Sequence, residues 1–224
     1  MSNILDLHEG DCIKYMQGME KKSVDLLLTD IPYNEVNRKD NGLRKLDKGV
    51  ADDAEFDLEE ALKQFMRVTR GSIYVFCGIE QVSYIKKTFR ENGLSTRLII
   101  WEKTNPSPMN GQSIWLSSVE CCVYGKFPKA TFNEHCKGTV LRFPCGRSKI
   151  HPTQKPTALF NKIVEVSSNE GDIVFDPFMG SGTAGESAIT LGRKFIGCEL
   201  DHEYFVAAKD RIEEVEKKKN GSLF

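Results

Sequence analysis

The sequence lacks the segments that membrane insertion and export require. No apolar stretch approaches the length of a transmembrane helix, and no basic segment followed by an apolar one stands at the amino terminus. We therefore expect a protein that neither spans a membrane nor carries an export signal, and that is cytoplasmic.

Paired cysteines and excess positive charge are also missing. The seven cysteines are an odd set without a C-x-x-C pair, and several lie in apolar runs. Reduced, packed cysteines are therefore expected, with no disulfide framework and no metal site. The formal net charge of −1 differs from the strongly basic balance of a dedicated nucleic-acid binder.

What is present is an alternation of strand-like and helix-like segments. A chain of 224 residues suits a single domain with its own core, here residues 1–224. The alternation predicts an α/β fold with a mostly parallel sheet covered by helices on both faces. Seven strands are expected, at residues 3–7, 24–28, 72–77, 97–101, 118–124, 173–175 and 194–198.

The first polar motif follows the aliphatic strand at 24–28 and contains Asp30, Ile31, Pro32 and Tyr33. Proline fixes its own backbone and extends the residue before it, so the turn is well defined. The Asp30 carboxylate and the Ile31 carbonyl can each accept one N–H of an exocyclic amine, and Tyr33 can stack on the ring that carries it. The alternative is a plain Pro-Tyr turn with a helix-capping aspartate.

The second motif has the order of a nucleotide site: a strand, a Gly-x-Gly turn, a helix, another strand and an acid. Asp176 follows the strand at 173–175, and Glu199 lies 23 residues later, where a carboxylate would bind ribose hydroxyls. No lysine follows Gly182, which excludes a triphosphate-binding P-loop. Asp176 would repel a pyrophosphate but suits a cationic cofactor such as S-adenosylmethionine.

Asp11 follows a strand and a glycine and precedes a short helix. Two interpretations stay open for it. It is either the N-cap of that helix or an acceptor for an adenine amino group at the same sheet edge as Asp30.

Four motifs carry a family resemblance: TDIPYN at 29–34, HPTQKP at 151–156, DPFMGSGT at 176–183 and IGCELDHEYF at 196–205. In this order they resemble the β class of DNA amino-methyltransferases, in which the target-amine motif precedes the cofactor motif. The resemblance implies a Rossmann-like methyltransferase fold with circularly permuted motif order. It also implies transfer of a methyl group from S-adenosylmethionine to a flipped base in double-stranded DNA. Asp30 favours adenine N6; cytosine N4, or an RNA base or protein glutamine, are the alternatives.

The resemblance also implies roles for single residues. Asp30, Ile31, Pro32 and Tyr33 would form the catalytic turn, although Ile31 stands where the family usually has a proline, which predicts a softer turn. Glu199 would bind the cofactor ribose and Asp11 its adenine. The full cofactor set comprises Asp11, Cys12, Asp30, Thr153, Lys155, Asp176, Pro177, Phe178, Gly180, Ser181, Gly182, Thr183, Glu199 and Leu200.

Two basic, weakly patterned segments, 35–54 and 103–150, are the candidate DNA-recognition loops, with residues 125–150 expected to be irregular. A solvated basic loop is the alternative. The expected DNA contacts are Arg38, Lys39, Arg44, Lys45, Arg142, Arg147 and Lys149. Cys145 follows a proline, as in cytosine-carbon methyltransferases, but the motif order favours a structural or groove-facing role. A homodimer and a partner restriction enzyme are both compatible with the resemblance.

Overall fold

The computed structural model describes residues 5–33, 57–108, 111–146 and 154–221. These residues form one mixed sheet of eight strands in the order β1-β8-β7-β2-β3-β5-β4-β6. The strands are β1 (Leu5–Glu9), β2 (Val24–Asp30), β3 (Thr69–Cys77), β4 (Ser95–Lys103), β5 (Val119–Lys126), β6 (Val140–Phe143), β7 (Ile173–Asp176) and β8 (Lys194–Glu199). Within these ranges, no helix combines the length and apolarity that crossing a bilayer would need.

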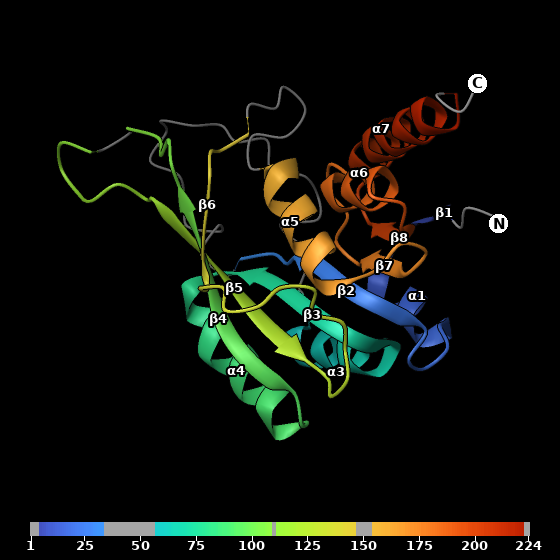
Figure 1. The fold of residues 1–224 in the computed structure, drawn as a ribbon, viewed down its shortest axis with the longest axis horizontal. Helices are drawn as coiled ribbons and strands as arrows, with labels where there is room; N and C mark the ends of the chain where they lie inside the picture. The colour runs from blue at the N-terminus through green and yellow to red at the C-terminus, as the bar shows by residue number, and fades with distance from the viewer. Residues whose placement is uncertain (1–4, 34–56, 109–110, 147–153, 222–224) are drawn as a thin grey trace.

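Helices cover both faces of the sheet, as predicted (Figure 1). They are α1 (Cys12–Gly18), α3 (Leu58–Val68), α4 (Val82–Glu91), α5 (Thr157–Ser167), α6 (Thr183–Thr190) and α7 (His202–Gly221), with a 3-10 turn η1 (Ile79–Gln81) before α4. Residues of α5, α6 and α7 belong to one hydrophobic cluster, and residues of α1, α3 and α4 belong to the other. The sheet therefore separates two cores.

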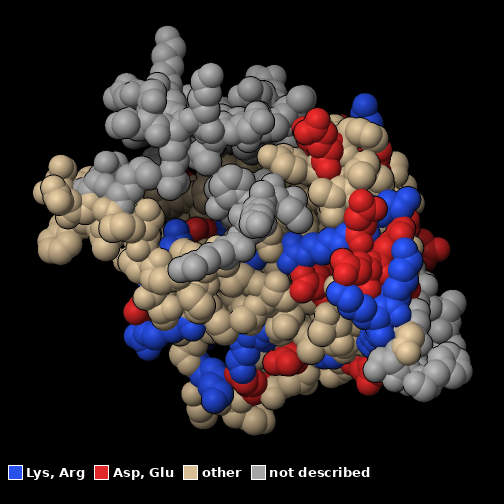
Figure 2. All heavy atoms as spheres, turned by 90° about the horizontal axis from the view of Figure 1, so that it is seen from above, with Lys and Arg blue, Asp and Glu red and all other residues tan. Residues whose placement is uncertain are grey.

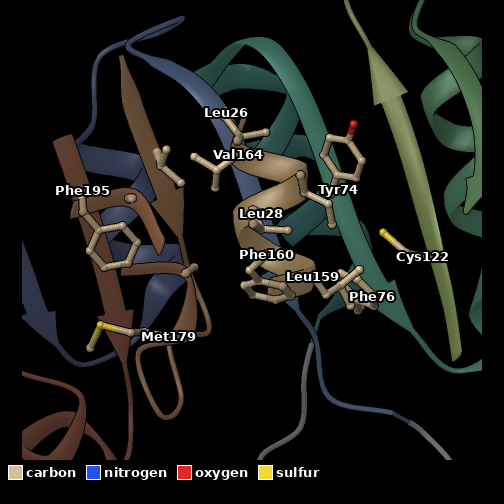
Figure 3. Close-up of a cluster of buried hydrophobic side chains, with 14 of the residues drawn as sticks. Leu26, Leu28, Tyr74, Phe76, Cys122, Leu159, Phe160, Val164, Met179 and Phe195 are labelled. Atoms are coloured by element: carbon tan, nitrogen blue, oxygen red, sulfur yellow. The ribbon is translucent and has the colours of Figure 1, made fainter. Parts of the chain in front are cut away.

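Alternation along the central strands assigns side chains to these two cores. Leu26 and Leu28 face the helices α5 to α7, whereas Leu27, between them, faces α1 and α3. Figure 3 shows the first of these cores, in which Phe160 of α5 stacks on Phe76 of β3 with ring centroids 5.6 Å apart. Burial on both faces explains why β2 reads as an uninterrupted aliphatic run.

The sheet is mostly parallel, as expected from the alternating pattern. β5 is the exception among the described strands, because it pairs antiparallel with both β3 and β4. The remaining pairings, β1 with β8, β8 with β7, β7 with β2, β2 with β3 and β4 with β6, are parallel.

The prediction of seven strands is wrong by one. β6 lies inside the segment 125–150, which was expected to be irregular, and it pairs with β4 from Val140 opposite Ile100 to Phe143 opposite Lys103. Its four residues are all exposed or half-buried, so they lack a buried apolar face to signal a strand. The edge of β4 and the bond from Trp101 Nε1 to the Phe143 carbonyl, 2.9 Å long, hold the strand in place.

The cysteines are reduced, as predicted: all seven are free thiols, and four of them are buried. The expected second loop, 103–150, contains β5 and β6 in addition to loop segments. The first, 35–54, lies outside the described residues.

Candidate active site

Four neighbouring parallel strands end at acidic residues. β1, β8, β7 and β2 lie side by side, so their carboxyl ends share one edge of the sheet. The acids there are, in spatial order, Asp11, Glu199, Asp176 and Asp30. Because neighbouring strands lie about 4.8 Å apart, this row spans roughly 14 Å. The row, called the acidic rim below, lies where open α/β sheets bind their ligands.

The acids of the rim differ in depth. Asp176 pairs with Gly197, and the residue before Asp176 pairs with Leu27. Asp30 and Glu199 therefore each lie two residues further along their strands, which is roughly 7 Å at the rise of a β-strand. Asp176 is the floor of the rim, flanked by an acid on each neighbouring strand.

Asp176 is a buried carboxylate, 3% exposed. Its Oδ1 accepts hydrogen bonds from the Thr29 hydroxyl at 2.7 Å and from the Phe178 backbone N–H at 3.1 Å. Burial raises the pKa of Asp176 to about 7, an effect that these two bonds oppose. Since both donors are neutral, a cationic ligand would further stabilise the ionised form. The rim therefore fits the sulfonium and ammonium groups of S-adenosylmethionine.

The turn after β7 depends on glycine. Gly180 and Gly182 adopt φ values of +50° and +78°, which side-chain-bearing residues rarely adopt. A Cβ on Gly182 would also lie 3.1 to 3.2 Å from atoms of Ala208 in α7. Arg211 of α7 fixes the turn further by donating to the Ser181 carbonyl at 2.8 Å. The backbone of the turn is thus held in one conformation beside the acidic rim.

Glu199 binds the turn from the other side. Its carboxylate accepts the Gly180 N–H at 2.7 Å and the Asp201 N–H at 2.9 Å. Burial raises the pKa of Glu199, while these backbone N–H groups lower it. An oriented carboxylate of this kind retains lone pairs for ribose hydroxyl groups. Leu200, which follows it, is half exposed.

Asp11 caps helix α1. Its Oδ1 accepts the N–H groups of Ile13 and Lys14 at 2.8 and 3.2 Å. The N-cap interpretation is therefore confirmed, and it leaves the adenine role untouched, because both bonds use the same oxygen. Cys12 is buried as the first residue of the helix.

The turn after β2 is held by hydrogen bonds as well as by its proline. The Ile31 N–H donates to the Phe76 carbonyl at 3.1 Å, and Gln81 Nε2 donates to the Pro32 carbonyl at 3.1 Å. A proline at position 31 would lack the first of these donors. The Ile31 side chain is 2% exposed and packs in the core on the α1 and α3 side. Packing and pairing thus replace the stiffness that a second proline would give.

An ion cluster surrounds Asp30. Lys155 Nζ lies 2.5 Å from Asp30 Oδ2 and 3.0 Å from Glu120 Oε2. The Tyr33 hydroxyl donates to Asp30 Oδ1 at 2.9 Å. Lys103 Nζ lies 2.8 Å from the other oxygen of Glu120. These five residues, called the rim cluster, form a chain of alternating charges, and the Lys155 side chain is 5% exposed.

Each charged group in this cluster is supported by its neighbours. Burial raises the pKa of Asp30, and the Lys155 ammonium opposes that rise. Burial alone would lower the pKa of Lys155, but the carboxylates of Asp30 and Glu120 outweigh it and raise the pKa. Burial and the Asp30 carboxylate raise the pKa of Tyr33, so its hydroxyl stays a donor.

The structure gathers many of the predicted site residues at one edge and places Lys155 against Asp30 rather than against the glycine turn. Sequence reasoning missed Glu120 and Lys103. Glu120 opens β5, and because β5 runs antiparallel, its beginning lies at the edge where the other strands end. Arg142 of β6 is two-thirds exposed and pairs with Glu102 at 3.0 Å. Thr153 and the predicted DNA contacts Arg38, Lys39, Arg44, Lys45, Arg147 and Lys149 lie outside the described residues.

A Rossmann-like sheet with an acidic rim and a glycine turn after the cofactor strand is the site of an S-adenosylmethionine-dependent methyltransferase. Comparison with known proteins defines the group further. A family model described as DNA methylase matches residues 109–210. Type II methyltransferase M.HpaI from Haemophilus parainfluenzae is 33% identical over 232 residues, which cover 91% of this chain and 73% of M.HpaI.

M.HinfI from Haemophilus influenzae, also a Type II methyltransferase, is 31% identical over 252 residues, covering 95% of this chain and 69% of M.HinfI. The crystal structure of the M1.HpyAVI–SAM complex superposes with a TM-score of 0.71 at 33% identity, covering 92% of this chain and 98% of that one. The chain therefore belongs to the DNA amino-methyltransferases of the β class, and its methyl donor is S-adenosylmethionine.

Replacing Gly182 by alanine should weaken cofactor binding roughly tenfold or more, because a left-handed residue with a Cβ costs about 1 to 2 kcal/mol and Ala208 leaves no room for it. The matched control is Gly171→Ala, which has a similar φ of +84° but open space around it. It should lower stability without weakening the binding of S-adenosylhomocysteine, measured by calorimetry. Equal losses of affinity in both variants would contradict a special role for the turn.

Cofactor affinity should also depend on pH through Asp176. The cationic cofactor favours the ionised carboxylate, so affinity is present above the pKa of about 7 and is lost as pH falls through it. Between about pH 8 and pH 6 the affinity for S-adenosylmethionine should fall roughly tenfold, which is the change in the ionised fraction. Calorimetric titrations of Asp176→Asn should show weak binding with little pH dependence. An unchanged pH dependence in this variant would assign the titration to another group.

Proposed function

We propose that this protein methylates the exocyclic N6 amine of an adenine that is flipped out of duplex DNA. The observation that carries the proposal is the position of Asp30. Its carboxylate is 32% exposed, ends the strand next to β7, and lies beside the Tyr33 ring. A planar amine can therefore reach an acceptor next to the region where the methyl donor binds.

The residues in the rim divide the work of holding the cofactor. We assign the methionine part to Asp176, Phe178 and the turn at 180–183, the ribose to Glu199, and the adenine to Asp11. S-adenosylmethionine supplies an electrophilic methyl group on a sulfonium sulfur. The buried carboxylate of Asp176 favours a cation at this position, because burial disfavours an uncompensated negative charge.

Asp30 and the Ile31 carbonyl act on the target amine. The lone pair of this nitrogen is delocalised into the base, and two acceptors on its hydrogens localise electron density on the nitrogen. The nitrogen forms its bond to the methyl carbon as the carbon–sulfur bond breaks, and the amine then loses one proton. Tyr33 stacks on the base, so positioning and preorganised charge supply most of the rate enhancement.

The duplex is proposed to lie over the acidic rim and the adjacent loops. Figure 2 shows basic and acidic side chains intermixed over the described part of one face, in keeping with the net charge of −1. We therefore assign phosphate contacts to the segments 35–54 and 103–150. Arg142 is a candidate because an exposed ion pair such as its pair with Glu102 contributes less than about 1 kcal/mol and is readily exchanged.

The loop between β4 and β5 supports this placement. It leaves the sheet at Lys103 and returns at Glu120, both members of the rim cluster. It forms the uncharged lobe at the left of Figure 2. Within it Ile114 and Trp115 are 68% and 96% exposed. An apolar pair beside a base-flipping site suits contact with unstacked bases.

Cytosine N4 is the second candidate substrate, since its amine presents the same two hydrogens to Asp30. Methyl transfer to unmethylated genomic DNA, followed by hydrolysis to nucleosides and mass spectrometry, separates the candidates. N6-methyladenine is the expected product. N4-methylcytosine would select the second candidate, and transfer to RNA alone would overturn both.

Asp30→Ala should abolish methyl transfer to DNA while leaving cofactor affinity nearly unchanged, because the carboxylate acts on the amine. The matched control is Asp25→Ala in the same strand, where the side chain pairs with Arg70 instead. The control should retain activity when folded. Labelled S-adenosylmethionine measures transfer in a single turnover, and a tenth or more of the wild-type rate in Asp30→Ala would count against the assignment.

A further inference from the structure

The rim cluster contains an ammonium group bound where the substrate amine is expected. Lys155 Nζ contacts Asp30 Oδ2, Glu120 Oε2 and the Tyr33 hydroxyl at 2.5, 3.0 and 3.3 Å. An ammonium has three hydrogens, and these contacts provide one acceptor for each. The lysine is therefore fully bonded in the DNA-free protein.

Both oxygens of Asp30 are engaged in this state. Oδ2 accepts from Lys155, and Oδ1 accepts from the Tyr33 hydroxyl. If Asp30 receives the target amine, as the proposed function requires, an N–H of the base must take a place that one of these donors holds. Lys155 is the donor whose chemistry, a nitrogen carrying hydrogens, matches that of the incoming group.

Glu120 offers Lys155 a second carboxylate. Burial raises the pKa of Glu120, but the ammonium groups of Lys155 and Lys103 outweigh it and lower the pKa, so the carboxylate stays ionised. The two carboxylates contact the same Nζ atom, and a lysine side chain has four rotatable bonds. A small rotation therefore moves the ammonium off Asp30 without leaving either charge unpaired.

We propose that Lys155 is a removable substitute for the target amine, and that Glu120 is the positioning residue that holds its ammonium when the base enters. In the DNA-free protein Lys155 keeps Asp30 anionic despite its partly buried position. When the base arrives, its N–H bonds Asp30, and Lys155 keeps its bonds to Glu120 and Tyr33. This inference rests on the proposed role of Asp30.

The test compares Lys155→Met, Glu120→Gln and the double variant in methyl transfer to unmethylated DNA as a function of pH. Loss of the cation in Lys155→Met should move the acidic limb of the rate profile upward by about one pH unit or more. Glu120→Gln should not move that limb upward. It should lower the rate roughly tenfold at every pH, because Lys155 then has Asp30 as its one carboxylate partner in the cluster.

The double variant removes both the substitute amine and its receiving carboxylate. Its rate should therefore exceed the product of the two single effects. Lys155→Arg keeps a cation and should leave the acidic limb near its wild-type position. Lys162→Met is the matched control, since Lys162 pairs with Glu134 outside the rim cluster. It should not move the limb, and thermal unfolding of each variant identifies losses that come from stability alone.

Two results would overturn the inference. One is a pair of single variants that slow transfer alike at every pH, with independent effects in the double variant. The other is a Lys155→Met variant that loses affinity for S-adenosylhomocysteine as strongly as it loses transfer, which would make Lys155 a cofactor ligand. Failure of the proposed function is distinguishable, because the wild-type protein would then transfer no methyl group to DNA.

Discussion

The parallel pairing of β2 with β7 is the constraint on which the site depends. It joins segments that lie far apart in the chain, and the hydrogen bond between Thr29 and Asp176 spans 147 residues. This pairing places the end of the target-amine strand beside the end of the cofactor strand. A shift of the register by one residue would turn Asp30 to the other face of the sheet. The aliphatic side chains of β2, buried on both faces, hold the register.

The same arrangement creates an electrostatic requirement. Asp30, Asp176 and Glu199 converge at one edge, and burial raises the pKa of all three. Such a group of carboxylates is stable as anions when cations or N–H donors face it. Backbone N–H groups serve Glu199, and Lys155 serves Asp30. Asp176 receives neutral donors, which is why it is the position that most favours a cationic cofactor.

Much of this could be predicted from the sequence because it follows from local rules. Asp30, Asp176 and Glu199 each end an apolar run, and the carboxyl ends of parallel strands share one edge. The family motifs then gave the order of the chain. The β6 strand was missed because its four residues lack a buried face and depend on β4 for their pairing. Glu120 was missed because an acid at the start of a strand reaches the rim when that strand is antiparallel, and a single sequence does not reveal strand direction.

The central claim is that the rim binds the methyl donor in one orientation, with its methyl group directed at Asp30. A crystal structure of the protein with S-adenosylmethionine bound tests this most directly. The account predicts ribose hydroxyls on Glu199, the methionine part against the turn at 180–183, and a methyl carbon that leaves an amine on Asp30 about 3 to 3.5 Å away. A cofactor bound in the reverse orientation, with its adenine nearest Asp30, or at another edge of the sheet, would contradict it.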